Sequence, residues 1–151
     1  MPVDQIVYLL LQNNPEKAVT ISGGEPLEQP GIVSLLEELY RSGASIVMFT
    51  GYEWSHICEN MRDLVQPIIM YVDVLVAGPY DRTRHAQGDA NEFLGLRGSF
   101  NQHVILMSGK YGSEDLMNGN RVEVIIDNDG VVVTGFPNKE TVKALKASLE
   151  G

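Results

Sequence analysis

The fold is decided by the stretch Val19-Thr20-Ile21-Ser22-Gly23-Gly24-Glu25-Pro26-Leu27. A short run rich in β-branched residues, typical of a strand, ends in two glycines, and a helical pattern begins after the Glu-Pro pair. Glycine adopts backbone angles closed to other residues and lets a ligand approach the main chain. In parallel α/β folds, ligands bind at the carboxyl ends of the strands. The stretch therefore predicts either a ligand-binding turn or, more simply, a tight strand-to-helix connection.

The length and composition are those of one globular domain. The chain has 151 residues, of which 44% are hydrophobic and 21% charged. Its 20 acidic and 11 basic residues give a net charge of −9, which disfavours binding to nucleic acid or to an anionic membrane. No apolar run approaches the roughly 18 residues that would span a membrane, and the N-terminus has no basic leader before an apolar stretch. We therefore expect a cytoplasmic protein.

Hydrophobic spacing predicts an alternation of helices and strands. Apolar residues at helical spacing predict helices at residues 3–10, 30–43, 54–61 and 138–149. Apolar runs predict strands at residues 17–21, 45–50, 71–76, 103–107, 121–126 and 131–134, with Asn128-Asp129-Gly130 as a hairpin turn between the last two. A long polar segment, residues 77–102, precedes the fourth strand and is typical of a functional or mobile loop.

This order of elements indicates an α/β fold with a mainly parallel sheet covered by helices. We expect the C-terminal hairpin to add antiparallel strands at one edge of the sheet. The chain opens on a helix rather than on a strand, so the strand at residues 17–21 is expected to be an exposed edge. We expect either the hairpin or a second copy of the chain, in a homodimer, to cover this edge.

Cysteine and histidine offer little for a metal site. Cys58 is the single cysteine, so this chain alone forms neither an internal disulfide nor a cysteine-built zinc or iron–sulfur site. It lies on the apolar face of its predicted helix, which favours a small buried hydrophobe over a nucleophile. His56, His85 and His103 are scattered, with no glutamate or cysteine at ligand spacing, which disfavours a metal site.

Two acidic residues each admit two interpretations. Asp73 lies within the predicted strand at residues 71–76, which is otherwise nearly all apolar, and a carboxylate there must be paired or hydrogen-bonded. It is either a functional group or a structural one, bound to backbone N–H groups or to an arginine such as Arg97. Glu25 is either a ligand-binding group or a side chain that favours the positive end of the helix after it.

Four separated segments match a known family in order and approximate spacing. They are residues 19–27, Phe49-Thr50-Gly51-Tyr52, Asp73-Val74-Leu75-Val76-Ala77-Gly78-Pro79-Tyr80 and Leu96-Arg97-Gly98-Ser99-Phe100-Asn101-Gln102. Together they resemble the radical S-adenosylmethionine (SAM) proteins, and the closest subgroup is the activating proteins of anaerobic ribonucleoside-triphosphate reductase. The Gly-Ser-x-Asn-Gln segment is the most specific of the four. The resemblance covers residues 3–107 of a single domain, residues 1–151, and leaves residues 108–151 as a variable tail.

The resemblance implies a partial α/β barrel and a shared cofactor site. In that family a Cys-x3-Cys-x2-Cys motif holds a four-iron four-sulfur cluster, and the Gly-Gly-Glu segment binds the amino group of SAM. Reductive cleavage of SAM gives a radical that takes a hydrogen atom from a glycine of the partner reductase. Carried over by position, the residues at the methionine end of SAM are Ser22, Gly23, Gly24 and Glu25. The residues expected at the carboxyl ends of later strands, facing the same cavity, are Thr50, Asp73 and Asn101.

The chain departs from the family pattern at two points. It has no Cys-x3-Cys-x2-Cys motif, and Ala77 stands where family members generally carry an aspartate. We therefore expect no 4Fe-4S cluster on this chain, no radical chemistry from it alone, and weak or residual binding of SAM. A missing N-terminal segment and a cluster-free relative both fit these departures. Two other interpretations stay open: a non-catalytic module that docks on a partner such as the reductase, and an unrelated α/β enzyme whose Gly-Gly-Glu-Pro turn binds another small ligand.

Overall fold

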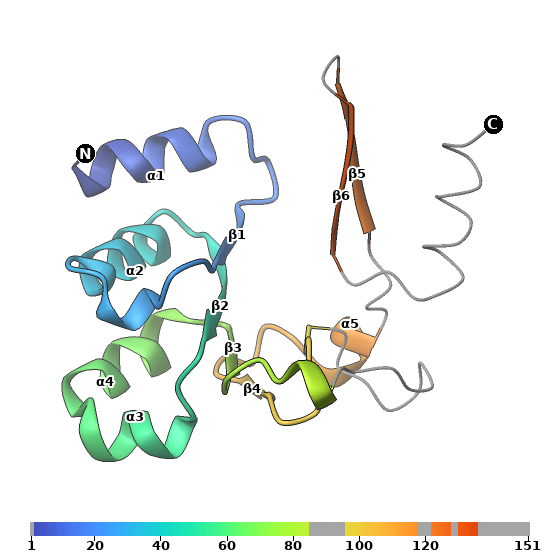
Figure 1. Ribbon diagram of the computed structural model, residues 1–151. Coiled ribbons are helices and arrows are strands. Elements are labelled where there is room, and N and C mark those ends of the chain that lie inside the picture. Colours follow the sequence, from blue (N-terminus) through green and yellow to red (C-terminus); the bar gives the residue numbers. More distant parts are fainter. Residues whose placement is uncertain (1, 85–95, 118–121, 128–129, 136–151) are drawn as a thin grey trace.

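The computed structural model describes residues 2–84, 96–117, 122–127 and 130–135, and these form an α/β fold (Figure 1). Its elements, in chain order, are α1 (Val3–Leu11), β1 (Ala18–Ile21), η1 (Pro26–Glu28), α2 (Ile32–Arg41), β2 (Ser45–Thr50), α3 (Trp54–Asn60), α4 (Arg62–Tyr71), β3 (Val74–Ala77), η2 (Arg82–Arg84), β4 (His103–Leu106), α5 (Ser113–Met117), β5 (Val122–Asp127) and β6 (Gly130–Gly135). The predicted helix at residues 138–149 lies outside the described residues. Among the described helices, none is long and apolar enough to cross a membrane.

The main sheet is open and mostly parallel, as the sequence predicted. Its strand order is β1-β2-β3-β4; β1, β2 and β3 run parallel, and β4 pairs antiparallel with β3. The β5–β6 hairpin forms a separate two-stranded sheet. The prediction that this hairpin adds strands to the main sheet was therefore wrong. The antiparallel strand at the edge of the main sheet is β4 instead. In the described residues, β5 and β6 pair with each other and not with β1.

Helices α1 to α4 lie on one side of the sheet, and the core lies between the two layers (Figure 1). The predicted apolar stripe of α2 faces inward: Leu36 and Leu39 are buried against Ile46 and Met48 of β2. Gly43, with φ +75°, ends the turn after α2 and leads the chain into β2. The apolar stripe of α2, spaced by the 3.6-residue helical period, therefore packs against the buried strand β2, and together they form one apolar interface.

The segment between β2 and β3 differs from the prediction. A helix starts at Trp54 as expected, but the backbone breaks at Met61 (φ −126°, ψ 46°) and a second helix, α4, follows. This helix contains Pro67 and includes Tyr71, so the third strand begins at Val74 rather than at residue 71. The end of α4 and the start of β3 are both apolar, and periodicity does not separate two such elements.

Candidate functional site

The ends of three parallel strands meet at one edge of the sheet, which we call the carboxyl edge. The turn after β1 contains Ser22, Gly23 and Gly24, and all three residues are exposed. Gly23 has φ +117°, a backbone angle that side-chain-bearing residues rarely adopt. A Cβ atom added at Gly24 would meet nothing within 4 Å, so the space beside this residue is open. The turn therefore presents accessible backbone, as the sequence predicted.

The carboxylate of Glu25 joins this turn to the end of β2. Its Oε1 accepts hydrogen bonds from the Leu27 N–H at 3.1 Å and from the Thr50 hydroxyl at 2.7 Å, and its Oε2 accepts the Gly51 N–H at 2.8 Å. Thr50 is only 4% exposed, and its Oγ1 in turn accepts the Tyr52 N–H at 3.2 Å. The structure thus brings Glu25 and Thr50 together. The Glu25 side chain also caps the short 3-10 helix η1, whereas the predicted helix that follows, α2, has Gly31 at its N-cap.

Gly78 links the end of β3 to both of its neighbours. Its N–H donates to the carbonyl oxygens of Thr50 at 3.1 Å and Tyr52 at 2.9 Å, and its φ is +115°. A Cβ atom at this position would lie 3.2 Å from the backbone oxygen of Asn101, so only glycine lets the two segments approach this closely. The Asn101 Nδ2 donates to the Pro79 carbonyl at 2.6 Å. Asn101 therefore lies at the carboxyl edge, although it precedes its own strand, because β4 runs antiparallel.

Sequence reasoning missed Gln102 and Ser99, which hold this corner together. Gln102 is 8% exposed; its Oε1 accepts the N–H groups of Gly98 and Ser99, and its Nε2 donates to the Gly78 carbonyl at 3.1 Å. Ser99 is fully buried, and its hydroxyl accepts the Asp81 N–H. Both residues belong to the Gly-Ser-x-Asn-Gln segment that carries the family resemblance, but only Asn101 of this segment was predicted as a site residue. Buried polar side chains with several backbone partners mark the residues that fix the loop.

Asp73 does not lie at the carboxyl edge, so that prediction was wrong. It precedes Val74 at the amino end of β3, whereas Thr50 pairs with Ala77 at the other end of the strand. Its carboxylate accepts the Ile46 N–H at 2.9 Å and the Ser108 hydroxyl at 2.7 Å, and Lys110 Nζ lies 3.8 Å from Oδ2. The structural interpretation is therefore confirmed for the backbone N–H contact, with lysine in place of arginine as the cation.

Acidic and aromatic side chains surround the end of β2. The Tyr52 hydroxyl donates a hydrogen bond to Glu28, and the Tyr52 ring stacks on His56 with centroids 5.0 Å apart. This hydrogen bond, followed by burial and by the negative charges of Glu28 and Glu25, raises the pKa of Tyr52 above its usual value of 10.0. Two carboxylates and a neutral phenol in one place favour a positively charged ligand.

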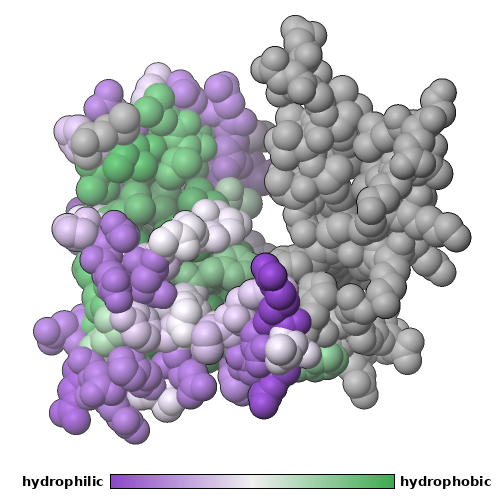
Figure 2. Space-filling view, viewed as in Figure 1, coloured by the Kyte–Doolittle hydropathy of each residue, from purple (hydrophilic) through white to green (hydrophobic). Residues whose placement is uncertain are grey.

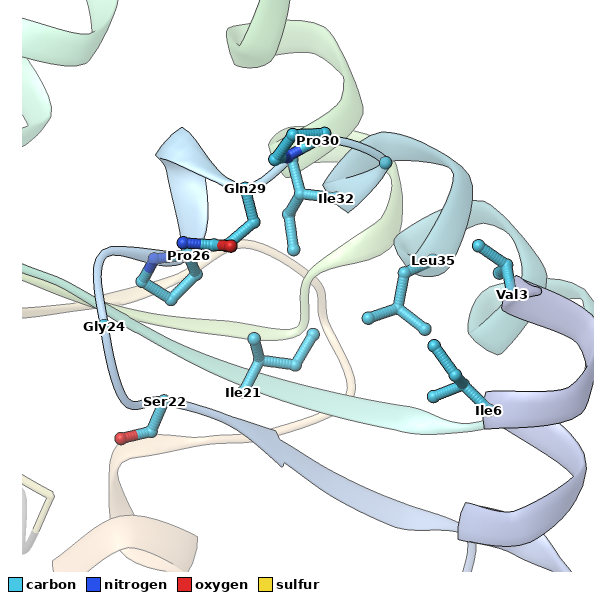
Figure 3. Close-up of a pocket in the computed structure, with 11 residues that line it drawn as sticks. Val3, Ile6, Ile21, Ser22, Gly24, Pro26, Gln29, Pro30, Ile32 and Leu35 are labelled. Carbon is cyan, nitrogen blue, oxygen red and sulfur yellow. The ribbon is translucent and has the colours of Figure 1, made fainter. Parts of the chain in front are cut away.

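A groove of about 430 Å³ opens beside the turn (Figure 3). Ser22 and Gly24 lie at one end of it, and Val3 and Ile6 of α1 lie at the other. The remaining lining residues come from β1, η1, the connection between η1 and α2, and the start of α2; they are Ile21, Pro26, Gln29, Pro30, Gly31, Ile32 and Leu35. The groove is therefore mostly apolar, with exposed backbone of the glycine turn at one end.

Comparison with known proteins identifies the family. The chain matches the model of the 4Fe-4S single cluster domain over residues 2–105, and it belongs to that family. No curated protein and no solved structure matches it.

The donor groups present do not fit an iron–sulfur cluster. The family is defined by such a cluster, which cysteine thiolates hold. The chain has one cysteine, Cys58, half-buried on α3. Within the described ranges, no group of three or more His, Cys, Asp or Glu side chains is arranged to bind a metal ion. Any cluster that works with this chain must therefore take its thiolates from elsewhere.

Proposed function

We propose that this member of the 4Fe-4S single cluster family provides the SAM-binding turn of a radical SAM activating protein, and that the turn binds SAM weakly without a cluster. The observation that supports this most is the exposed turn from Ser22 to Gly24, held at the carboxyl edge by Glu25. The resemblance to radical SAM proteins supports the proposal, because it implies that the same residues contact the methionine end of SAM.

The chemistry of the turn suits the ammonium group of SAM. A carboxylate offers about four acceptor positions. In the described part of the chain, Glu25 uses two of them on Oε1 and one on Oε2. One position on Oε2 is left for an N–H of the ligand, and the open backbone at Gly24 allows the approach. Glu25 would then orient the amino group, and Thr50 would keep the carboxylate in place.

The expected affinity follows from the small number of contacts. Hydrogen bonds to charged groups contribute roughly 1.5–3 kcal/mol each, and association loses much of this gain as translational and rotational freedom. In complete radical SAM relatives a cluster would bind the methionine end of SAM, and this chain has no cysteine triplet to hold one. Without that contact we expect a dissociation constant on the order of millimolar, or about −4 kcal/mol.

Titration calorimetry or ligand-observed NMR with SAM tests the proposal. Gly24→Val should abolish binding, because it fills the space where the ligand meets the backbone, at a position where an added Cβ meets nothing within 4 Å. Gly109→Val is the matched control, since a Cβ there also meets nothing within 4 Å and the residue lies outside the groove. Equal binding by wild type and Gly24→Val would show that the turn is only structural.

The expectation that this chain alone holds no iron–sulfur cluster has its own test. We expect this chain, incubated with iron and sulfide under anaerobic conditions, to stay colourless, because one cysteine does not hold a cluster. We also expect no activation of an anaerobic ribonucleotide reductase by this chain alone. A brown product that survives desalting would contradict the proposal and would indicate ligands other than a cysteine triplet.

One observation favours a second candidate, a non-catalytic module that docks on a partner enzyme. Glu25 already accepts three hydrogen bonds from its own chain, so the turn is built without any ligand. In that case SAM has no measurable affinity for the chain. The same carboxyl edge then binds the glycyl-radical reductase directly, which sedimentation of the two purified proteins together would detect.

A further inference from the structure

The outer edge of β1 and the groove beside α1 form one continuous surface on which a further strand can dock. We propose that this surface binds an extended apolar segment with basic flanking residues, supplied by another polypeptide, which joins the sheet as an additional strand beside β1. This proposal does not depend on SAM binding, although the groove ends at Ser22 and Gly24 of the proposed SAM-binding turn.

The first argument is the hydrogen-bonding pattern of β1. The Lys17 carbonyl accepts the Ser45 N–H at 2.8 Å, so residues 17, 19 and 21 direct their peptide groups toward β2. The peptide groups of Ala18 and Thr20 point outward. Asn14 Nδ2 donates to the Ala18 carbonyl at 2.8 Å, but the N–H and C=O of Thr20 have no partner in the described part of the chain. Unpaired N–H and C=O groups on an edge strand offer a template for pairing with another chain.

The second argument is the apolar surface next to that edge. Figure 2 shows hydrophobic residues gathered over α1 and α2. Figure 3 shows Ile21 of β1, Leu35 of α2 and the α1 side chains Val3 and Ile6 around a common space. Alternate side chains of a strand project to the same face of a sheet, so every second residue of an added strand would enter this groove.

The third argument is charge, and it decides between a second copy and another protein. The charged residues in the segment 2–41, which includes α1, β1, η1 and α2, are two bases, Lys17 and Arg41, and the acids Asp4, Glu16, Glu25, Glu28, Glu37 and Glu38; Arg41 pairs with Glu37. Two copies of this surface repel each other, and the net charge of −9 adds to the repulsion. A segment with flanking lysine or arginine residues is attracted to it instead.

A labelled synthetic peptide tests the proposal on the full chain. The probe is acetyl-Lys-Lys-Val-Thr-Val-Thr-Val-Lys-Lys, and its partner replaces every lysine by glutamate. Thr20→Pro removes the outward N–H and is compatible with an edge strand, and Thr20→Val keeps that N–H as the matched control. Ile6→Lys places a charge in the groove. Tyr8→Lys places the same charge on α1 outside the groove, at a side chain 67% exposed.

Fluorescence anisotropy should show saturable binding of the lysine-flanked peptide. Binding should be at least about tenfold weaker for Thr20→Pro, for Ile6→Lys and for the glutamate-flanked peptide, and nearly unchanged for Thr20→Val and Tyr8→Lys. Amide NMR signals of residues 18–22 should shift on binding. The proposal is overturned if the peptide does not bind or if folded Thr20→Pro binds it as tightly as wild type. A wild-type dimer that Thr20→Pro dissociates would also overturn it, in favour of a second copy.

Discussion

The Glu25 carboxylate should stabilise the fold as well as bind a ligand, and Glu25→Gln separates the two contributions. Three donors converge on this side chain: the N–H groups of Leu27 and Gly51 and the Thr50 hydroxyl. A glutamine amide has one oxygen and one NH2 group. If its oxygen replaces Oε1, its NH2 group faces the Gly51 N–H, donor against donor. If it flips, two of the three bonds are lost instead.

The expected loss in the free energy of unfolding follows from the orientation of the glutamine amide that keeps more hydrogen bonds. One charge-assisted hydrogen bond is lost, and two others change from a charged to a neutral acceptor. Bonds to charged groups contribute roughly 1.5–3 kcal/mol and neutral ones about 1 kcal/mol. The Gly51 contact is exposed, so water replaces part of the loss. We expect Glu25→Gln to lower the free energy of unfolding by about 2 kcal/mol, or about 4–8 °C in melting temperature.

Urea unfolding followed by circular dichroism measures this change, and a double-mutant cycle assigns it. Thr50→Val removes the buried hydroxyl at nearly constant volume. Together with Glu25→Gln it should destabilise by about 1 kcal/mol less than the sum of the single changes, because the two residues share a bond. The control is Glu37→Gln, which breaks an exposed ion pair with Arg41 and should change stability by less than about 0.5 kcal/mol. An unfolding midpoint of Glu25→Gln equal to that of the control would refute the reasoning.

Three further predictions follow from the other polar contacts. Asp73→Ala should lower stability by about 2–3 kcal/mol, because it leaves an N–H and a hydroxyl unpaired, and it should not change SAM affinity if the protein stays folded; urea unfolding and calorimetry check both parts. Gln102→Met should lower stability by about 2–4 kcal/mol in the same urea assay, because it removes the partners of three backbone groups near Gly78. The raised pKa of Tyr52 stabilises the folded state below pH 10.0, and this contribution is lost as the pH rises through the raised value; NMR of labelled tyrosine should show the pKa falling in Glu28→Gln.

Periodicity predicted the elements that have one buried face. The α2 stripe and the β2 run were located correctly because Leu36, Leu39, Ile46 and Met48 all face one core. The same reasoning failed at residues 62–73, where α4 was missed. Pro67 interrupts the helical pattern, and the apolar residues continue through the helix end into the strand. Local pattern does not decide where one buried element stops and the next begins.

Part of the site could be predicted because its residues lie near strand ends. The sequence does not show at which end of a strand a residue lies. Glu25 and Thr50 meet because β1 and β2 are parallel neighbours. Asp73 is near an end of its strand too, but at the amino end, and one residue's position in an apolar run does not reveal which end it marks. The contact of Gln102 with Gly78 joins residues 24 apart across an antiparallel pair, so it depends on a strand direction that composition does not specify.

The Glu25 network also limits how a ligand could be added to this chain. Both acceptor positions on Oε1 are occupied by Leu27 and Thr50, so a ligand that displaced either donor would lose about as much as it gained. An ammonium group that uses the remaining position on Oε2 breaks no bond and adds a charge-assisted one. Glu25→Gln should then weaken both folding and SAM binding, whereas Gly24→Val should abolish SAM binding and leave folding unchanged. If Glu25→Gln lowers stability as expected while SAM affinity stays unchanged, the carboxylate serves only the fold, and the ligand, if it binds, does so through the backbone of the turn.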